Sequence, residues 1–95
     1  MPKAETWVYE QDSKIVGFIA LIGNEVGAIF VHSNYQRRGI GKKLMDFAKS
    51  IRENLVLDVF KENRMGRAFY HKYGFKQIGE HVHEETGQKL LRLKL

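Results

Sequence analysis

Cysteine is absent from the 95 residues of this chain, which excludes disulfide bonds, thiolate nucleophiles and zinc sites built on cysteine. No apolar run approaches the roughly 18 residues that a membrane-spanning helix needs, so the sequence predicts no membrane association. The opening residues, MPKAETWVYE, contain no apolar signal-peptide core. We therefore expect a cytoplasmic protein, and the length predicts a single domain over residues 1–95.

Basic side chains outnumber acidic ones. The 16 Lys and Arg residues against 11 Asp and Glu give a formal net charge of +5. Such a balance suits an anionic partner, and nucleic acid, an acidic membrane surface and a phosphate-bearing cofactor all qualify. Composition alone leaves the choice among them open.

Hydrophobic periodicity predicts the order of the secondary structure elements. Three strands come first, the apolar period then changes to that of a helix, and a strand, a second helix and a final hairpin follow. The expected strands cover residues 6–9, 15–22, 25–31, 55–60, 75–82 and 89–95. The expected helices cover residues 40–53, with core positions Ile40, Leu44, Phe47, Ala48 and Ile51, and residues 64–73, with core positions Met65, Ala68, Phe69 and Tyr73.

This order predicts an α+β fold with a mixed sheet. Short links, including the hairpin signal Gly23-Asn24, favour an antiparallel arrangement of the first three strands. The connection from strand 25–31 through helix 40–53 to strand 55–60 predicts a parallel, right-handed crossover. Asn63 is a good N-cap for the second helix, and Gly74 is placed to end it.

A basic glycine turn between residues 36 and 43 is the most informative stretch. A turn between a strand end and a helix start leaves the first backbone N–H groups of the helix free to bind an anion. Gly39 and Gly41 would let a phosphate approach the main chain, and the neighbouring Arg37, Arg38, Lys42 and Lys43 add countercharge. The stretch matches neither the Walker pattern nor the dinucleotide fingerprint. Alone, it fits a pyrophosphate site and an ordinary basic helix start about equally.

Two motifs together resemble the GNAT superfamily of acyl-CoA N-acyltransferases. Gln36-Arg37-Arg38-Gly39-Ile40-Gly41 is similar to the family's pyrophosphate loop, [QR]-x-x-G-x-[GA]. Asn63-Arg64-Met65-Gly66-Arg67-Ala68-Phe69-Tyr70-His71-Lys72-Tyr73-Gly74-Phe75 resembles its second signature, N-x-x-[AG]-x-x-[FL]-Y-x-x-x-G-F. The two motifs occur in the family's order, and the resemblance extends from Trp7 to Leu95.

The resemblance implies a set of acetyl-CoA-binding residues. The end of strand 25–31 would pair with the pantetheine arm, the glycine turn would hold the pyrophosphate, and one asparagine would hydrogen-bond the arm. The implied cofactor-binding residues are Ile29, Phe30, Val31, Gln36, Arg37, Arg38, Gly39, Ile40, Gly41, Lys42, Lys43 and Asn63. Asn63 could also serve only as a helix N-cap, and the two roles are compatible.

The resemblance also implies two catalytic residues. Tyr70 matches the tyrosine that often protonates the departing thiolate of coenzyme A, and it sits off the main core stripe of its helix. Its alternative role is that of a half-buried aromatic residue. Glu25 lies where many members place a general-base glutamate, although an exposed carboxylate at a strand end is an equal alternative. No metal is expected, and His81 and His83 are read as part of a solvated hairpin tip.

One departure from the family concerns the start of the chain, which corresponds to the family's second strand. The opening strand and the two helices after it are missing, so we expect a short member. Those elements form much of the acceptor wall, and a homodimer could complete the truncated fold.

The sequence therefore predicts an N-acetyltransferase that moves an acetyl group from acetyl-CoA to a primary amine by direct attack. The alternatives are a catalytically impaired coenzyme A-binding module or subunit and, less favoured, a basic nucleic-acid-binding domain. The acceptor stays open among a protein amine, an amino acid, a polyamine and a drug amine.

Overall fold

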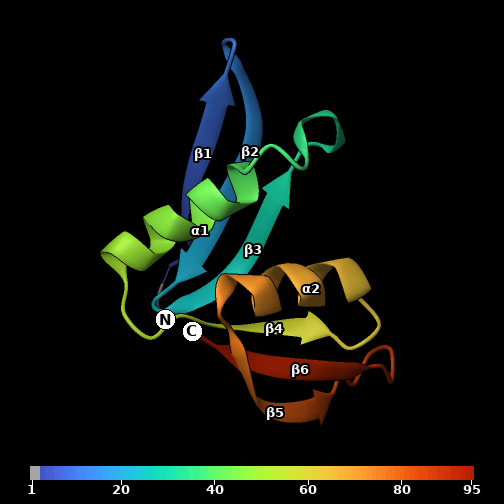
Figure 1. The fold of residues 1–95 in the computed structure, drawn as a ribbon. Helices are drawn as coiled ribbons and strands as arrows, with labels where there is room; N and C mark the ends of the chain where they lie inside the picture. Colours follow the sequence, from blue (N-terminus) through green and yellow to red (C-terminus); the bar gives the residue numbers. More distant parts are fainter. Residues whose placement is uncertain (1–2) are drawn as a thin grey trace. The chain divides into compact units, whose positions relative to one another are not determined.

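The computed structural model describes residues 3–95, and the chain divides into two units between Leu55 and Val56 (Figure 1). The first unit contains β1 (Glu5–Gln11), β2 (Lys14–Ile22), β3 (Glu25–Val31), the 3₁₀ helix η1 (Ser33–Tyr35) and α1 (Ile40–Ile51). The second contains β4 (Val56–Phe60), α2 (Arg64–Tyr73), β5 (Lys76–Val82) and β6 (Lys89–Lys94). The single domain and the parallel crossover expected between the units stay predictions.

The three strands of the first unit form the expected antiparallel arrangement, with β2 between β1 and β3. The β1–β2 hairpin closes through Asp12 and Ser13, both with positive φ, 53° and 63°, as a type I′ turn requires. The β2–β3 hairpin closes through Gly23 and Asn24, and there Gly23 alone has a positive φ, 62°, as in a type II′ turn. Register shifts interrupt both strand pairs, at Tyr9/Glu10 and at Ala20/Leu21.

Helix α1 packs on one face of this sheet (Figure 1). A Cβ on Gly17 of β2 would lie 3.4 Å from Leu44 Cδ1 and 2.8 Å from the carbonyl oxygen of Phe30, so the sheet approaches the helix closely where residue 17 has no side chain. The expected core positions Ile40, Leu44 and Ala48 are buried.

Two positions of α1 differ from the predicted stripe. Phe47 is 38% exposed and packs edge-on against Trp7 of β1, with ring centroids 5.3 Å apart, whereas Met45 is fully buried. The buried stripe is therefore displaced around the helix, toward Met45 and away from Phe47. Ile51, the last residue of α1, is partly exposed.

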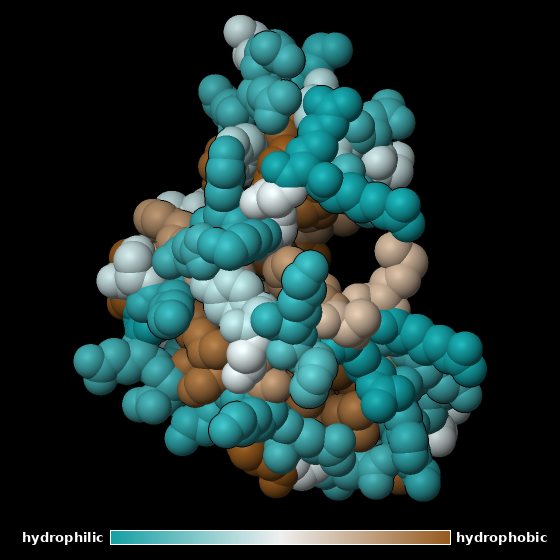
Figure 2. Space-filling model, viewed as in Figure 1, coloured by the Kyte–Doolittle hydropathy of each residue, from teal (hydrophilic) through white to brown (hydrophobic). Residues whose placement is uncertain are grey.

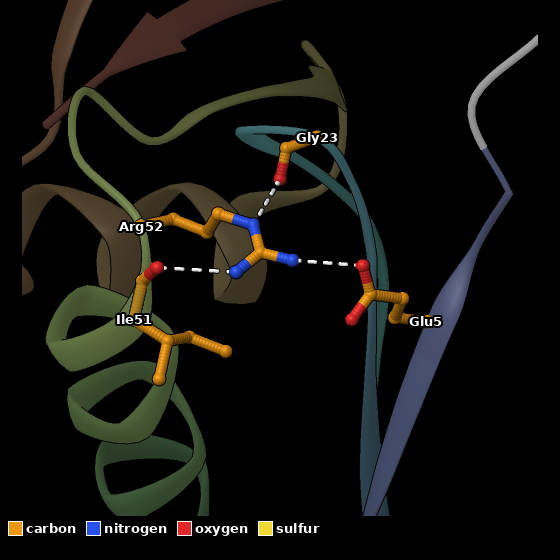
Figure 3. Close-up of polar contacts among 4 residues, drawn as sticks. All are labelled: Glu5, Gly23, Ile51 and Arg52. Atoms are coloured by element: carbon orange, nitrogen blue, oxygen red, sulfur yellow. Dashed lines mark hydrogen bonds and ion pairs between the residues drawn. The ribbon is translucent and has the colours of Figure 1, made fainter.

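Arg52 ends α1 two residues earlier than predicted. Its backbone is extended (φ −138°, ψ 142°), and its guanidinium group donates three hydrogen bonds, to the carbonyl oxygen of Gly23 (3.0 Å), the carbonyl oxygen of Ile51 (3.1 Å) and Glu5 Oε1 (2.9 Å) (Figure 3). Asn24 Nδ2 also donates to the carbonyl oxygen of Asn54 at 2.8 Å. The β2–β3 turn is thus tied to the end of α1 by side chains from both partners.

The second unit pairs β6 with both β4 and β5 in antiparallel fashion, which confirms the C-terminal hairpin. Its buried side chains are Leu57, Val59, Phe75, Leu91 and Leu93. Each unit thus joins antiparallel strands to one helix, and the predicted α+β class is confirmed.

Helix α2 begins and ends as predicted, at Asn63 and Gly74, but two of its four expected core positions, Met65 and Ala68, are wrong. No residue of α2 is fully buried, Met65 is 71% exposed and Ala68 is exposed. The half-buried side chains Phe69, Tyr70 and Tyr73 instead form an aromatic cluster with Phe75. The apolar stripe therefore runs through Tyr70 because aromatic contacts replace aliphatic burial on this helix.

Hydrophobic regions, membrane-spanning helices and metal-binding groups are the features that would indicate a binding partner at the surface. Figure 2 shows hydrophilic side chains over the tip of the β1–β2 hairpin, at the top of the view. Within residues 3–95, neither helix has the length and apolar character to cross a membrane. The same residues contain no group of three or more His, Cys, Asp or Glu side chains that could hold a metal ion.

Candidate active site

The link between β3 and α1 is a tightly bonded loop. The backbone N–H of His32 donates to the carbonyl oxygen of Val16 at 2.7 Å, which extends the β2–β3 pairing past the end of β3. The short helix η1 follows, and the side chain of Gln36 then reaches back, where Nε2 donates to the carbonyl oxygen of Val31 at 3.2 Å. Gln36 thereby closes the loop onto the strand end.

Two residues of this loop have left-handed backbone conformations, Arg37 (φ 65°) and Gly39 (φ 79°). A Cβ on Gly39 would meet no atom within 4 Å, so the glycine is needed for its φ and for an open approach to the main chain, not for packing inside the protein. Alternation of left- and right-handed residues curves a backbone so that successive N–H groups converge, which is the geometry of an anion-binding nest.

Backbone donors continue into the first turn of α1. The first helical hydrogen bond runs from Lys43 N–H to the carbonyl oxygen of Gly39 (3.0 Å), so the N–H groups of Ile40, Gly41 and Lys42 have no acceptor within the helix. Gly39 provides no capping side chain, and the first turn contains no acidic residue. These three donors and the positive end of the helix dipole suit a bound anion.

The four cations of the loop differ in their partners. The Arg38 guanidinium lies over the ring of Tyr35, 5.2 Å from its centroid, and Lys42 forms an exposed ion pair with Asp46 at 2.9 Å. Lys43 Nζ lies 3.2 Å from the hydroxyl of Tyr9 on β1. Arg37 has no side-chain partner among residues 3–95. Arg37 is therefore the cation best able to meet an anion without giving up another contact.

The structure also shows a residue that the sequence pattern did not single out. Tyr35 packs edge-on against His32 (6.0 Å between centroids) and carries Arg38 on its ring. His32 in turn caps η1, since its Nδ1 accepts a hydrogen bond from Asn34 N–H at 3.1 Å. The sequence could have indicated this contact, because an aromatic residue, Tyr35, stands three positions before Arg38.

The predicted residues of β3 lie along one strand. Ile29, Phe30 and Val31 pair with Ile19, Phe18 and Gly17 of β2, and Phe30, 51% exposed, stacks on Phe18 with centroids 5.7 Å apart. Glu25 is partly exposed at the opposite end of the strand from the loop. At about 3.3 Å per residue, roughly 20 Å separates Glu25 from Val31, so an extended ligand is needed to span the two ends.

Asn63 begins α2 in the second unit. Its Oδ1 accepts a hydrogen bond from Gly66 N–H at 2.9 Å, which confirms the predicted N-cap. A Cβ on residue 66 would lie only 2.6 Å from Asn63 Nδ2, so this capping geometry requires glycine at position 66. The amide Nδ2 has no acceptor among residues 3–95 and is available as a donor to a ligand.

Tyr70 lies on the same helix, about 10 Å along the axis from Asn63. Its ring stands edge-on to Phe69 and to Phe75, with centroids 5.4 and 5.7 Å apart. Burial raises the pKa of the Tyr70 hydroxyl above its ordinary value of 10.0, because the charged phenolate is poorly solvated among aromatic rings. A tyrosine is already protonated at neutral pH at its ordinary pKa, so Tyr70 carries a proton that it can donate.

The predicted site residues thus form two sets. The first unit brings together the end of β3, the glycine loop and the start of α1. The second unit places Asn63 and Tyr70 on one helix. His81 and His83 belong to neither set, since His81 Nε2 lies 3.7 Å from Asp58 Oδ2 and His83 Nδ1 lies 3.1 Å from Thr86 Oγ1.

Comparison with known proteins relates the whole chain to acetyltransferases. The chain is 34% identical over 87 residues to the peptidyl-lysine N-acetyltransferase YiaC of Escherichia coli K12, covering 90% of this chain and 60% of that protein. It is 30% identical to the peptidyl-lysine N-acetyltransferase YjaB of the same organism, covering 100% of this chain and 65% of YjaB. The chain therefore spans about two thirds or less of the length of these relatives.

Solved structures and a family model agree with these matches. The solution structure of apo-form YjaB from Escherichia coli superposes with a TM-score of 0.85 at 30% identity, covering 97% of this chain and 65% of that one. A Bacillus anthracis protein described as a putative streptothricin acetyltransferase, solved with acetyl coenzyme A, shares the fold with a TM-score of 0.87 at 22% identity, covering 100% of this chain and 64% of that one. The model of the acetyltransferase (GNAT) domain matches residues 2–77. The chain belongs to the GNAT acetyltransferase family.

Proposed function

We propose that this chain transfers an acetyl group from acetyl-CoA to a primary amine, and that the amine is a lysine side chain of a protein. The observation that carries the proposal is the glycine loop, in which left-handed Arg37 and Gly39 lead into three N–H groups that have no acceptor within α1. We infer acetyl-CoA as the acyl donor from the family. We infer a lysine side chain as the acceptor from the similarity to the peptidyl-lysine N-acetyltransferases YiaC and YjaB.

The residues of the first unit would bind the cofactor. In this proposal the N–H groups of residues 40–42 and the cations of residues 37–43 hold the pyrophosphate. The backbone of residues 29–31 pairs with the pantetheine arm, which runs from the loop along β3. Glu25, at the far end of the strand, would then accept the proton that the attacking amine loses.

The residues of the second unit would act on the same cofactor. Asn63 would donate from Nδ2 to the arm while its Oδ1 continues to cap α2. As the amine nitrogen bonds to the carbonyl carbon and the carbon–sulfur bond breaks, Tyr70 would donate its proton to the departing thiolate. Tyr70 carries this proton at neutral pH, as a general acid must.

Gly39→Glu tests the cofactor assignment. A side chain at this position would project into the open approach to the loop, so calorimetric binding of acetyl-CoA should be lost. Gly87→Glu is a matched control, because Gly87 also has a positive φ (71°) and open space around it, but lies in the β5–β6 turn. Equal acetyl-CoA affinity of the two variants would refute the pyrophosphate assignment.

Turnover of acetyl-CoA with a panel of amines tests the reaction. We expect acetylation of a lysine peptide, and less of a free amino acid, a polyamine or an aminoglycoside. Binding of acetyl-CoA without turnover of any amine would favour a coenzyme A-binding module instead. A rise in melting temperature with duplex DNA but not with coenzyme A would favour the nucleic-acid alternative.

A cytoplasmic location and a homodimer belong to the same proposal and are carried over from the sequence. Light scattering on the assayed sample tests the dimer, which predicts twice the 11.1 kDa mass of the chain. Cell fractionation tests the location.

A further inference from the structure

A second candidate site lies entirely within the C-terminal unit. A pocket of about 480 Å³ opens between α2 and the strands β5 and β6. This volume falls within the range of small-molecule sites, about 300–1,000 Å³. None of the residues that line it has been assigned a role in acetyl transfer.

The floor of the pocket is apolar and well ordered by packing. Phe75, Leu91 and Leu93 line it and are only 3%, 3% and 7% exposed. Leu91 and Leu93 are two residues apart on β6 and so present their side chains to the same face of the sheet. This floor would bury the apolar body of a ligand.

The rim of the pocket is basic. Arg64, Arg67 and His71 line it from α2, at a spacing of three and four residues that places them along one side of the helix. Arg67 Nη1 donates to the carbonyl oxygen of Lys61 at 2.9 Å, which fixes that guanidinium. The side chains of Arg64 and His71 have no hydrogen-bond or ion-pair partner among residues 3–95.

No acidic side chain lines this pocket, so its cations are not neutralised from within. Ala68, at the middle of the α2 side, contributes only a methyl group, and Gln77 adds an amide from β5. A helix that packs on a sheet ordinarily fills this space with a large apolar side chain. The space above Phe75, Leu91 and Leu93 stays open because residue 68 is small.

We propose that this pocket binds a small organic oxyanion, a carboxylate or a phosphate with a short aromatic or aliphatic body. The body would lie on the leucine and phenylalanine floor, and the oxyanion would accept hydrogen bonds from Arg64 and His71. This inference goes beyond the proposed acetyl transfer and does not depend on it, because no residue of the pocket belongs to the two sets described above.

Amide chemical-shift titration of the full chain tests the pocket without acetyl-CoA. The probes are phenyl phosphate and phenylacetate, with benzyl alcohol as the uncharged analogue and inorganic phosphate as the anion without a body. We expect saturable shifts at Arg64, Ala68, His71, Leu91 and Leu93 with one or both aromatic anions. Benzyl alcohol and inorganic phosphate should bind there at least about tenfold more weakly, since the alcohol lacks the oxyanion and the phosphate lacks the apolar body.

Two variants separate charge from shape. Arg64→Gln should weaken binding of the aromatic anion by about tenfold, whereas Lys72→Gln, which removes the same charge from α2 outside the pocket, should leave it unchanged. Ala68→Phe should block binding by filling the cavity while Arg64, Arg67 and His71 all remain. Equal affinities for benzyl alcohol and phenyl phosphate, equal effects of Arg64→Gln and Lys72→Gln, or shifts confined to residues 36–43 would each overturn the proposal.

Discussion

The side chain of Asn63 occupies the space that a Cβ on residue 66 would need. Its Nδ2 lies 2.6 Å from that position, and its Oδ1 accepts the hydrogen bond from Gly66 N–H at 2.9 Å. The asparagine and the glycine of the second family motif are therefore coupled, because the observed position of the Asn63 side chain leaves no room for a Cβ on residue 66.

This coupling predicts a non-additive stability effect. Gly→Ala inside a helix ordinarily stabilises by about 0.8–1.0 kcal/mol, but Gly66→Ala would displace the Asn63 cap, which contributes about 1 kcal/mol. We expect a net change near zero in the natural chain and a gain of about 1 kcal/mol in an Asn63→Ala background. Urea unfolding of the four proteins of this double-mutant cycle gives the two values. The same gain in both backgrounds would contradict the coupling.

The two roles of Asn63 can be separated by substitution. Asp and Ser cap helices about as well as Asn, but neither has the amide donor proposed to hold the arm of acetyl-CoA. Asn63→Asp and Asn63→Ser should therefore keep the free energy of unfolding within about 0.5 kcal/mol. Both should weaken acetyl-CoA binding by about tenfold, the usual loss for one hydrogen bond to a buried partner. Unchanged calorimetric affinity would leave Asn63 with the capping role alone.

The half-buried side chain of Tyr70 predicts a specific pH dependence. Because its pKa is raised in the folded state above 10.0, its contribution to stability is complete below the unfolded value and is lost as pH rises through the folded pKa. The free energy of unfolding should thus fall more steeply above pH 10 in the natural chain than in Tyr70→Phe. Denaturant titrations from pH 8 to 11 measure both curves. Parallel curves would show that burial does not perturb this hydroxyl.

The same variant tests catalysis. Tyr70→Phe should lower kcat by about a hundredfold, as loss of a general acid does, while KM for acetyl-CoA changes little. Unaltered kcat across the pH range would remove Tyr70 as the acid.

The three hydrogen bonds of Arg52 predict a large effect at the end of α1. Arg52→Ala should destabilise the chain by about 1–2 kcal/mol, since two backbone carbonyls and a carboxylate lose their donor. Arg52→Lys should recover less than half of this loss, because an ammonium group cannot reproduce the planar fork. Glu5→Gln should cost less than about 0.5 kcal/mol, as expected of an exposed ion pair. Lys49→Ala in the last turn of α1 is the control. If it lowers the free energy of unfolding as much as Arg52→Ala does, the three hydrogen bonds of Arg52 are not the cause of the effect.

Most of the secondary structure could be predicted because local signals and tertiary packing agree. The β3 bounds and the start of α1 follow from patterning, and Asn63 and Gly74 bound α2 by ordinary capping chemistry. The end of α1 could not be predicted, because it is set by contacts of Arg52 with Gly23 and Glu5, far away in the sequence.

Packing details were harder to predict than element order. The stripe expected on α2 included Met65, which is exposed, because aliphatic periodicity does not anticipate an aromatic cluster through Tyr70. For the candidate site, the motifs predict a pyrophosphate loop, and that role stays a prediction. Nothing local in the sequence indicates that Lys43 contacts Tyr9, 34 residues away. Pairing across a sheet depends on register, which single positions do not encode.

The β1–β2 turn is less stable than a turn with its backbone conformation can be. Asp12 and Ser13 both hold left-handed conformations that Asn and Gly adopt at lower cost. Asn-Gly at these positions therefore offers a simple way to a more thermostable protein for the binding and turnover measurements. The turn also tolerates side chains that project into solvent, so it is a suitable position for a fluorophore or an affinity tag.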